Sequence, residues 1–301
     1  MKIKKSNQIQ HPSKTFDVLS SYARLSRIHQ PIGILLLFLP CLFGIFLSLK
    51  KLPNPEPLEI IKIILLFLAG SIIMRSAGCI INDLFDYKFD QKVTRTKNRP
   101  IASGKITHIQ ALIFLALLLL GGLFILLQLN QAAIFSGFFV LTLVISYPLM
   151  KRITYYPQFF LGLAFNFGII MSGLAIIGKI DADFFILYFS AIIWTIIYDT
   201  IYAYQDIEDD LKIGVKSSAI KFAKNPKKIL IILSLIMSLN LVLLGIRGNF
   251  YSGFFLLILF ASLLSSLLIK KCNFNSSASC LKAFKANFWV GILILIAIIL
   301  G

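Results

Sequence analysis

The chain has 301 residues, of which 58% are hydrophobic and 14% are charged, and its formal net charge is +17. The apolar residues gather in blocks of about 20, the length that a helix needs to cross the hydrocarbon core of a bilayer. This pattern excludes an ordinary soluble domain. The basic residues lie mostly in loops between the blocks, so membrane topology explains the charge and no nucleic-acid partner is expected.

Nine apolar blocks predict about nine transmembrane helices and hence an all-α membrane protein. Stretches such as ALIFLALLLLGGLFILL lack the polar–apolar alternation of a membrane barrel strand. The expected spans are Ile32–Leu49, Leu58–Ile81, Ile109–Leu129, Ala132–Leu149, Pro157–Ile177, Phe184–Ala203, Ile229–Ile246, Phe250–Ile269 and a short Ala286–Leu300.

The distribution of lysine and arginine predicts the orientation of these spans. Most of the 30 basic residues fall in the N-terminal segment and in the loops that share its side of the membrane. By the positive-inside rule, the N-terminus is expected in the cytoplasm. We therefore expect a cytoplasmic arm at residues 1–28 and a single transmembrane domain at 29–301. We also expect a bacterial inner membrane, with the active site facing the cytoplasm.

Two acidic clusters follow the second and sixth expected spans. The first reads N-D-L-F-D-Y-K-F-D, and at 100° per residue its polar members fall within about 100° of one another on a helix. In the second cluster Glu208 points away from the other acids. The residues that share the two faces are Asn82, Asp83, Asp86 and Asp90, then Asp199, Asp206, Asp209 and Asp210.

Carboxylates grouped in this way at a membrane boundary need a counter-ion. Like charges three or four residues apart destabilise a helix, and a carboxylate within the membrane costs more. Mg²⁺ suits such sites because it binds one or two carboxylates together with phosphate oxygens. Alternatively, the acids are solvated loop residues paired with nearby lysines. That alternative leaves Asp199 and Arg75, which lie inside apolar runs, without an explanation.

Basic and polar residues near the acids are candidates for binding a phosphorylated substrate. Arginines can donate two parallel hydrogen bonds to diphosphate oxygens. Arg95, Lys97 and Arg99 follow the first cluster and fit either this role or the topology signal. Asn166 and the tyrosines Tyr147 and Tyr202 are candidates too. Their alternatives are an interhelical hydrogen bond and an interfacial aromatic belt.

At these residues the chain resembles the UbiA-type intramembrane aromatic prenyltransferases, most closely the branch that acts on 4-hydroxybenzoate. The first family motif, N-D-x-x-D-x-x-x-D, begins here at Asn82, and the second, D-x-x-x-D, spans Asp206 and Asp210. The stretches RTKNRPIASG, SYPLMKRITYYPQFFLGLAFNFG and YDTIYAYQDIEDDLKIGVKSSAI resemble this branch in particular. The resemblance runs from about Tyr22 to Ala223, and beyond it only hydropathy and span count agree.

The resemblance implies nine helices around a cavity that opens sideways to lipid. It also implies transfer of a polyprenyl group from polyprenyl diphosphate to the carbon ortho to the hydroxyl of 4-hydroxybenzoate, in ubiquinone biosynthesis. Mg²⁺ is the implied cofactor and no protein partner is specified. The predicted metal ligands are Asn82, Asp83, Asp86, Asp90, Asp206, Asp209 and Asp210. The predicted catalytic residues are Asp199 and Arg99, and the predicted substrate-binding residues are Arg75, Arg95, Lys97, Arg99, Tyr147, Lys151, Arg152, Asn166 and Tyr202.

One turn departs from the family pattern. The branch usually carries an acid and a base before the first span, where this chain has Arg27-Ile28-His29-Gln30-Pro31. A substrate contact at that turn is therefore in doubt. Two alternatives remain open from the sequence: a prenyltransferase with a haem, naphthoate or homogentisate acceptor, and a membrane transporter.

Overall fold

The computed structural model describes residues 14–301, and all of the regular secondary structure in that range is helical. Nine segments of the described chain are long and apolar enough to span a membrane, which confirms the predicted all-α membrane fold. The elements are α1 (Lys14–Leu25), α2 (Ile32–Leu49), α3 (Pro57–Asp90), α4 (His108–Leu126), α5 (Gln131–Ile153), α6 (Pro157–Asn166), α7 (Gly168–Ile177), α8 (Ala182–Ala203), the 3₁₀ turn η1 (Tyr204–Asp206), α9 (Ile207–Ile213), α10 (Ser218–Lys221), α11 (Pro226–Arg247), α12 (Ser252–Lys271) and α13 (Ser277–Leu300).

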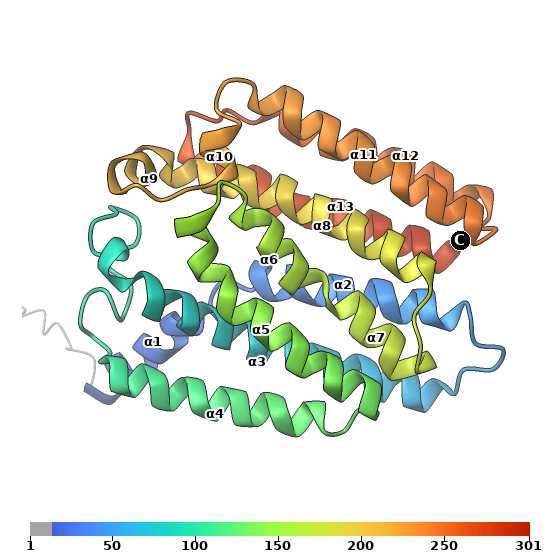
Figure 1. Cartoon of the computed structure of the whole chain (residues 1–301), viewed down its shortest axis with the longest axis horizontal. Coiled ribbons are helices and arrows are strands. Elements are labelled where there is room, and N and C mark those ends of the chain that lie inside the picture. Colours follow the sequence, from blue (N-terminus) through green and yellow to red (C-terminus); the bar gives the residue numbers. More distant parts are fainter. Residues whose placement is uncertain (1–13) are drawn as a thin grey trace, which may run out of the picture.

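The spans run back and forth, so that alternate loops meet at the same end of the bundle (Figure 1). The C-terminal ends of α3 and α5 lie at the left of this view together with α1, α9 and α10. The C-terminus and the loops that follow α2, α4, α7 and α11 lie at the right. Both acidic clusters are therefore at one end, the end that also holds the longest loops.

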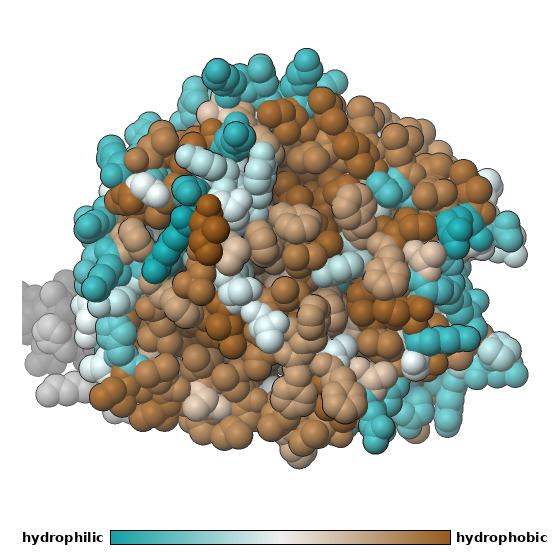
Figure 2. Space-filling view, viewed as in Figure 1, coloured by the Kyte–Doolittle hydropathy of each residue, from teal (hydrophilic) through white to brown (hydrophobic). Residues whose placement is uncertain are grey.

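Apolar side chains cover the middle of the molecule between two polar ends (Figure 2). This broad apolar belt is the surface that contacts lipid in a bilayer. The hydrocarbon core contains no water to bind polar groups, so only apolar side chains are expected on this surface. Many large apolar side chains of α4 are exposed on it, for example Leu117 and Phe124.

The main core joins α2, α7, α8 and α11–α13. Trp194 is fully buried at its centre and packs against Phe43 and Tyr198, with ring centroids 6.1 and 5.2 Å away. Helices α2 and α7 approach closely because Gly44 and Gly168 lack side chains. A Cβ at Gly44 would lie 2.5 Å from the carbonyl oxygen of Ile169, so only glycine fits there. Such close contacts between small residues are typical of membrane helix pairs.

Several boundaries differ by one to four residues from the expected spans, and three differences are larger. Helix α3 continues nine residues beyond Ile81 to Asp90, as the acidic motif itself required. The fifth span is broken into α6 and α7 at Phe167. The last helix begins at Ser277, not at Ala286, because Ser276 caps it and its polar first turns still bury Cys280 and Ala283.

The predicted N-terminal arm lies partly outside the described residues, since residues 1–13 are not described. The described part contains α1, whose Leu25 is fully buried and packs with Tyr22 against α3 and α4. The division into an arm and a single domain stays a prediction.

Candidate active site

One cavity of about 1360 Å³ reaches from the polar end of the bundle into its apolar interior. Thirteen of the predicted site residues line it, although they come from α3, α5, α8, η1, α9 and the loop between α3 and α4. They are Arg75, Asn82, Asp86, Asp90, Arg95, Arg99, Tyr147, Lys151, Arg152, Asp199, Tyr202, Asp206 and Asp210. Asp86 and Asp206 thus share one cavity, so a single ligand can contact both.

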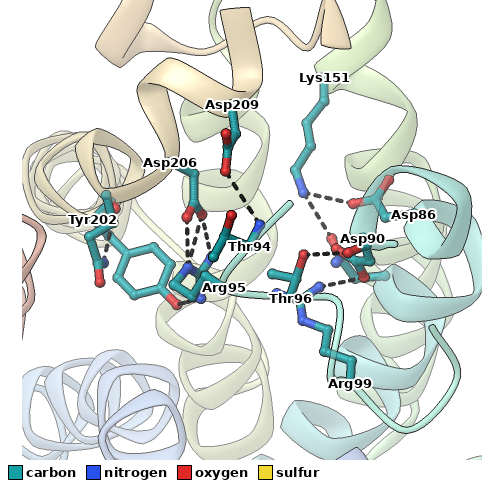
Figure 3. A network of polar contacts seen from close by, with 12 residues as sticks. Asp86, Asp90, Thr94, Arg95, Thr96, Arg99, Lys151, Tyr202, Asp206 and Asp209 are labelled. Carbon is teal, nitrogen blue, oxygen red and sulfur yellow. Dashed lines mark hydrogen bonds and ion pairs between the residues drawn. The ribbon is translucent and has the colours of Figure 1, made fainter. Parts of the chain in front are cut away.

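The first acidic cluster occupies the last two turns of α3. Asn82 and Asp86 are one turn apart, and their oxygens meet at the ammonium of Lys151 from α5, at 3.2 and 2.9 Å. Figure 3 shows the pair of Lys151 and Asp86. The neighbouring Arg152 donates to the carbonyl of Phe85 at 2.9 Å, which ties the end of α5 to α3. An amide oxygen and a carboxylate oxygen therefore already converge on one cation.

Asp83 points away from this group. It is 1% exposed, does not line the cavity, and accepts a 2.5 Å hydrogen bond from Arg27 and a 3.2 Å bond from Arg99. Arg99 also donates to Asp90 at 2.7 Å. Burial alone would lower the pKa of Arg27, but the charge of Asp83 raises that pKa above its ordinary value. The guanidinium therefore stays charged.

The second acidic cluster contacts the loop of residues 91–107, which also carries Arg99. Arg95 forms a bidentate ion pair with Asp206 and donates to the hydroxyl of Tyr202 at 3.0 Å (Figure 3). Burial would lower the pKa of Arg95, but the hydrogen bond to Asp206 and the neighbouring phenol raise that pKa. The loop of residues 91–107 therefore bridges both clusters, because Arg95 holds one and Arg99 the other.

Four predicted site residues do not line the cavity. Besides Asp83, they are Lys97, Asn166 and Asp209. Lys97 is exposed, and Asp209 accepts from the backbone N–H of Thr94 at 3.4 Å. Asn166 donates to Gly162 and to Thr195 on α8, both at 2.8 Å. This is the interhelical hydrogen bond that the sequence left open as its alternative.

Arg75 lies deeper in the cavity, among apolar side chains. Its guanidinium lies 5.4 Å from the ring centroid of Phe165, and no hydrogen bond or ion pair to it is recorded within residues 14–301. The charge of Asp199 on α8 interacts with that of Arg75, but no ion pair or hydrogen bond joins the two side chains in the described chain, so the guanidinium keeps donors free for a ligand. Arg75 is therefore suited to bind an anion.

The cavity also contains residues that the motifs did not indicate. Arg27, His29 and Gln30 reach it from the turn before α2, where the chain departs from the family pattern. Phe284 and Lys285 reach it from α13, and the Phe284 ring packs 4.7 Å from that of Tyr202. No motif marks α13, so sequence reasoning had no signal for it.

The carboxylate and amide oxygens at the polar end of the cavity suit a hard divalent cation. Within the described chain no three carboxylate, histidine or cysteine side chains gather as a ready-made metal site. However, Mg²⁺ requires only one or two carboxylates when phosphate oxygens complete its shell. Asn82 and Asp86 already enclose a cation, the Lys151 ammonium. The residues present therefore fit the predicted metal.

Residues 37–292 match the model of the UbiA prenyltransferase family. The chain belongs to this family. Curated relatives are named 4-hydroxybenzoate polyprenyltransferase, mitochondrial. The one from Dictyostelium discoideum is 43% identical over 96% of this chain, and the chain spans 62% of that relative's length. The Arabidopsis thaliana relative is 43% identical over 93% of the chain and 68% of its own length, and the human relative 41% over 94% and 76%.

Solved structures confirm that the chain has the fold of this family. A UbiA homolog from Aeropyrum pernix K1 has a TM-score of 0.74 at 21% identity and covers 88% of this chain and 96% of its own. A UbiA homolog from Archaeoglobus fulgidus, solved with GPP and Mg²⁺, has a TM-score of 0.69 at 18% identity and covers 93% and 99%. The family model and the curated relatives confirm the predicted prenyltransferase family, and these structures confirm its fold.

One prediction is wrong. We expected a bacterial inner membrane with a cytoplasmic active site, whereas the curated UbiA relatives reported above are mitochondrial proteins of eukaryotes. The error has a physical reason. Hydropathy and basic loops indicate that a chain spans a bilayer and how it is oriented there. They do not distinguish a bacterial inner membrane from a mitochondrial membrane.

Proposed function

We propose that this chain transfers a polyprenyl group from polyprenyl diphosphate to 4-hydroxybenzoate, as a step of ubiquinone biosynthesis. The allylic C–O bond to the diphosphate breaks, and a C–C bond forms at the ring carbon ortho to the hydroxyl. The ring then loses the proton from that carbon. The products are 3-polyprenyl-4-hydroxybenzoate, diphosphate and H⁺. The names of the curated relatives support this substrate pair.

One observation carries the proposal: a single cavity joins a cationic and carboxylate-rich end to a long apolar wall. The polar end contains the Asp86–Lys151 and Arg95–Asp206 pairs, at the boundary of the apolar belt. The apolar part is lined by side chains of α3, α4 and α5, for example Met74, Leu123 and Phe138. An amphiphile with a diphosphate head and an isoprenoid tail matches both parts.

The diphosphate head is assigned to the polar end. Asn82, Asp86 and Asp90 on one side and Asp206 and Asp210 on the other would hold Mg²⁺, which neutralises the phosphate charge and so assists departure of the leaving group. Arg95, Arg99 and Lys151 line the same space and would donate hydrogen bonds to the phosphate oxygens. Fixed donors of this kind stabilise negative charge as it develops on the leaving group.

The aromatic acceptor is assigned to the deeper part of the polar end. Within residues 14–301 Arg75 has no hydrogen bond or ion pair to another side chain, so its free donors would bind the carboxylate of 4-hydroxybenzoate. Asp199 also lines the cavity and would accept the phenol proton or the ring proton. The rings of Tyr147, Tyr198 and Phe165 would attract the allylic cation through their π faces.

The apolar part would contain the isoprenoid tail. Leu120 and Phe138 line the cavity and remain 62% and 53% exposed, so the wall formed by α4 and α5 is not closed. A tail longer than the cavity can therefore extend into the bilayer between these helices. The names of the relatives support a mitochondrial membrane as this bilayer.

The decisive test compares two acidic residues that lie two positions apart. Asp206→Asn removes the partner of Arg95 in the cavity, whereas Glu208→Gln changes an exposed acid on the far side of the same segment. We expect Asp206→Asn to lower kcat at least about 1000-fold, as losing a transition-state interaction does, and Glu208→Gln to keep wild-type rates. Product from 4-hydroxybenzoate and a prenyl diphosphate is measured by mass spectrometry in proteoliposomes, with and without EDTA.

The acceptor is tested in the same assay. Offering 4-hydroxybenzoate, homogentisate and a naphthoate together with one prenyl diphosphate should give product from 4-hydroxybenzoate alone. Full activity of Asp206→Asn, or activity unchanged by EDTA, contradicts the diphosphate assignment. Product formed mainly from another acceptor contradicts the acceptor assignment and leaves the prenyl-transfer chemistry in place.

A further inference from the structure

Gly33, in the first turn of α2, lies directly against the guanidinium of Arg75 on α3. A Cβ placed on Gly33 would lie 2.5 Å from Nε, 2.8 Å from Nη2 and 3.0 Å from Cζ of Arg75. Ordinary contacts between such atoms are near 3.5 Å or longer. The Arg75 side chain therefore occupies the space that any larger residue at position 33 would fill.

The other sides of the guanidinium are also defined. The Phe165 ring of α6 is 5.4 Å away, and both Gly33 and Arg75 line the cavity. The guanidinium thus contacts a glycine of α2 and lies over a phenyl ring of α6, and it lines the cavity. A planar group constrained in this way presents two parallel donors to a carboxylate in a fixed direction.

We propose that Gly33 is a positioning residue that determines acceptor specificity, because it holds the Arg75 guanidinium where the acceptor's carboxylate binds. The inference rests on the assignment of Arg75 to that carboxylate. Gly33 positions the Arg75 guanidinium without touching either substrate, so it acts only through Arg75.

The contact decides how a substitution acts. In Gly33→Ala the atoms nearest to the new methyl group belong to the far end of a flexible side chain, so the guanidinium moves and the backbone does not. The shift needed is roughly 1 Å, and displacements of that size at a reacting centre can cost about 100-fold in rate. Alanine is favourable in a helix, so the variant is expected to fold.

The test measures the preference for a carboxylate over its neutral amide. The ratio of kcat/KM for 4-hydroxybenzoate to kcat/KM for 4-hydroxybenzamide is determined in wild type, Gly33→Ala and Arg75→Ala. Gly253→Ala is the control, since Gly253 is an exposed glycine of α12 that lies outside the cavity, and a Cβ added there would have no heavy atom within 4 Å. We expect a ratio above about 10 in wild type and in the control, as removing a charged hydrogen-bond partner implies.

Arg75→Ala should bring this ratio close to 1, and Gly33→Ala should lower it at least about fivefold while the amide reacts at wild-type efficiency. The KM for the prenyl diphosphate should change less than about twofold in Gly33→Ala, because Arg95, Arg99 and Lys151 are undisturbed. In the double variant Gly33→Ala/Arg75→Ala, the ratio should equal that of Arg75→Ala alone.

The possible failures are distinguishable. If Arg75→Ala keeps the wild-type preference for the carboxylate, the assignment of Arg75 in the proposed function is wrong. If Arg75→Ala loses the preference but Gly33→Ala retains it, the inference about Gly33 is overturned while the assignment of Arg75 stands. Equal losses with both acceptors in Gly33→Ala would indicate a purely structural role and also overturn the inference.

Discussion

At the residue scale, Asp83 and Asp86 illustrate how far a motif determines the role of its members. They are three residues apart on α3, yet Asp86 lines the cavity and Asp83 lies behind its wall. Asp83 accepts hydrogen bonds from Arg27 and Arg99, and its second carboxylate oxygen is buried without a partner. The geometry indicates that Asp83 orders two arginines of the cavity and that Asp86 faces the ligand.

The environment of Arg27 supports this distinction. Arg27 has a φ of 55°, a left-handed conformation that costs a non-glycine residue about 1–3 kcal/mol. Such a conformation persists when other contacts stabilise it, and here the ion pair with Asp83 is that contact. The turn that departs from the family pattern is therefore attached to the motif through Asp83.

The two aspartates should consequently fail in different ways. Asp86→Asn should raise the Mg²⁺ concentration for half-maximal activity at least about tenfold, because it removes a predicted ligand. Asp83→Asn should leave that concentration within about twofold and lower the free energy of unfolding by about 3–5 kcal/mol, since the half-buried Arg27 loses its ion pair and Arg99 keeps only the pair with Asp90. Metal titrations and thermal unfolding in detergent measure both effects. A metal dependence shifted equally in both variants contradicts the separation.

At the element scale, an ion-pair group joins three loops at the end of the bundle opposite the cavity mouth. Lys51, after α2, binds Asp181 at 2.8 Å and Asp183 at 2.6 Å, and Arg247 at the end of α11 binds Asp183 at 3.1 Å. Partial burial would raise the pKa of Asp181, but the hydrogen bond and charge of Lys51 lower it below its ordinary value. For Lys51, burial would lower the pKa and the two aspartates raise it.

These directions determine the pH dependence. A depressed folded-state pKa at Asp181 adds stability above the ordinary pKa of aspartate, and this is lost as pH falls through the folded value. A raised pKa at Lys51 adds stability below the ordinary pKa of lysine, and this is lost as pH rises through the folded value. The group therefore contributes across the whole neutral range, by about 0.2–1 kcal/mol per exposed pair.

Replacing the lysine tests this contribution. Lys51→Met should lower the unfolding temperature between about pH 5 and 9, and the difference should shrink in high salt because exposed charges are screened. Lys179→Met removes one exposed charge from the same end and should have no effect, since no ion pair of Lys179 is recorded in the described chain. A Lys51→Met difference that is independent of salt would contradict an electrostatic origin.

At the scale of the whole molecule, the cavity combines parts from distant regions of the chain. Its apolar wall comes largely from α3–α5, and its polar end needs α8, α9 and the loop of residues 91–107 as well. The shape of the apolar part should therefore influence which prenyl chains are accepted, because a tail segment that cannot lie along this wall loses its packing contacts with the protein.

A bulky residue in this wall should shift the accepted chain length. Leu123→Trp replaces a leucine that lines the cavity with a bulky indole ring. With a mixture of prenyl diphosphates, the products should then carry shorter prenyl chains. Phe124→Trp, the next residue of α4, is 69% exposed and does not line the cavity, so its product distribution should match wild type. Mass spectrometry of the products gives the distribution. An unchanged distribution in Leu123→Trp contradicts placement of the tail along α4.

Most of the fold was predictable because its signals are local. Eight of the nine spans follow from apolar length alone, and the ninth was predicted too short because the first turns of α13 are polar. The break at Phe167 was not predicted, since both halves of that span are apolar and no proline or polar run separates them. Of the site, the cavity-facing acids followed from helical periodicity, while Phe284 and Lys285 carried no motif.

The sequence by itself determined the number of spans, the placement of both acidic clusters at one end, and the family. These properties depend on hydropathy, charge and spacing within single segments, which the order of residues specifies directly. Only the tertiary structure decided that Arg95 binds Asp206, that Asp83 faces Arg27, and that Gly33 lies against Arg75. Such contacts join helices that are distant along the chain, and their geometry arises from packing at distances of a few ångströms, which no local pattern encodes.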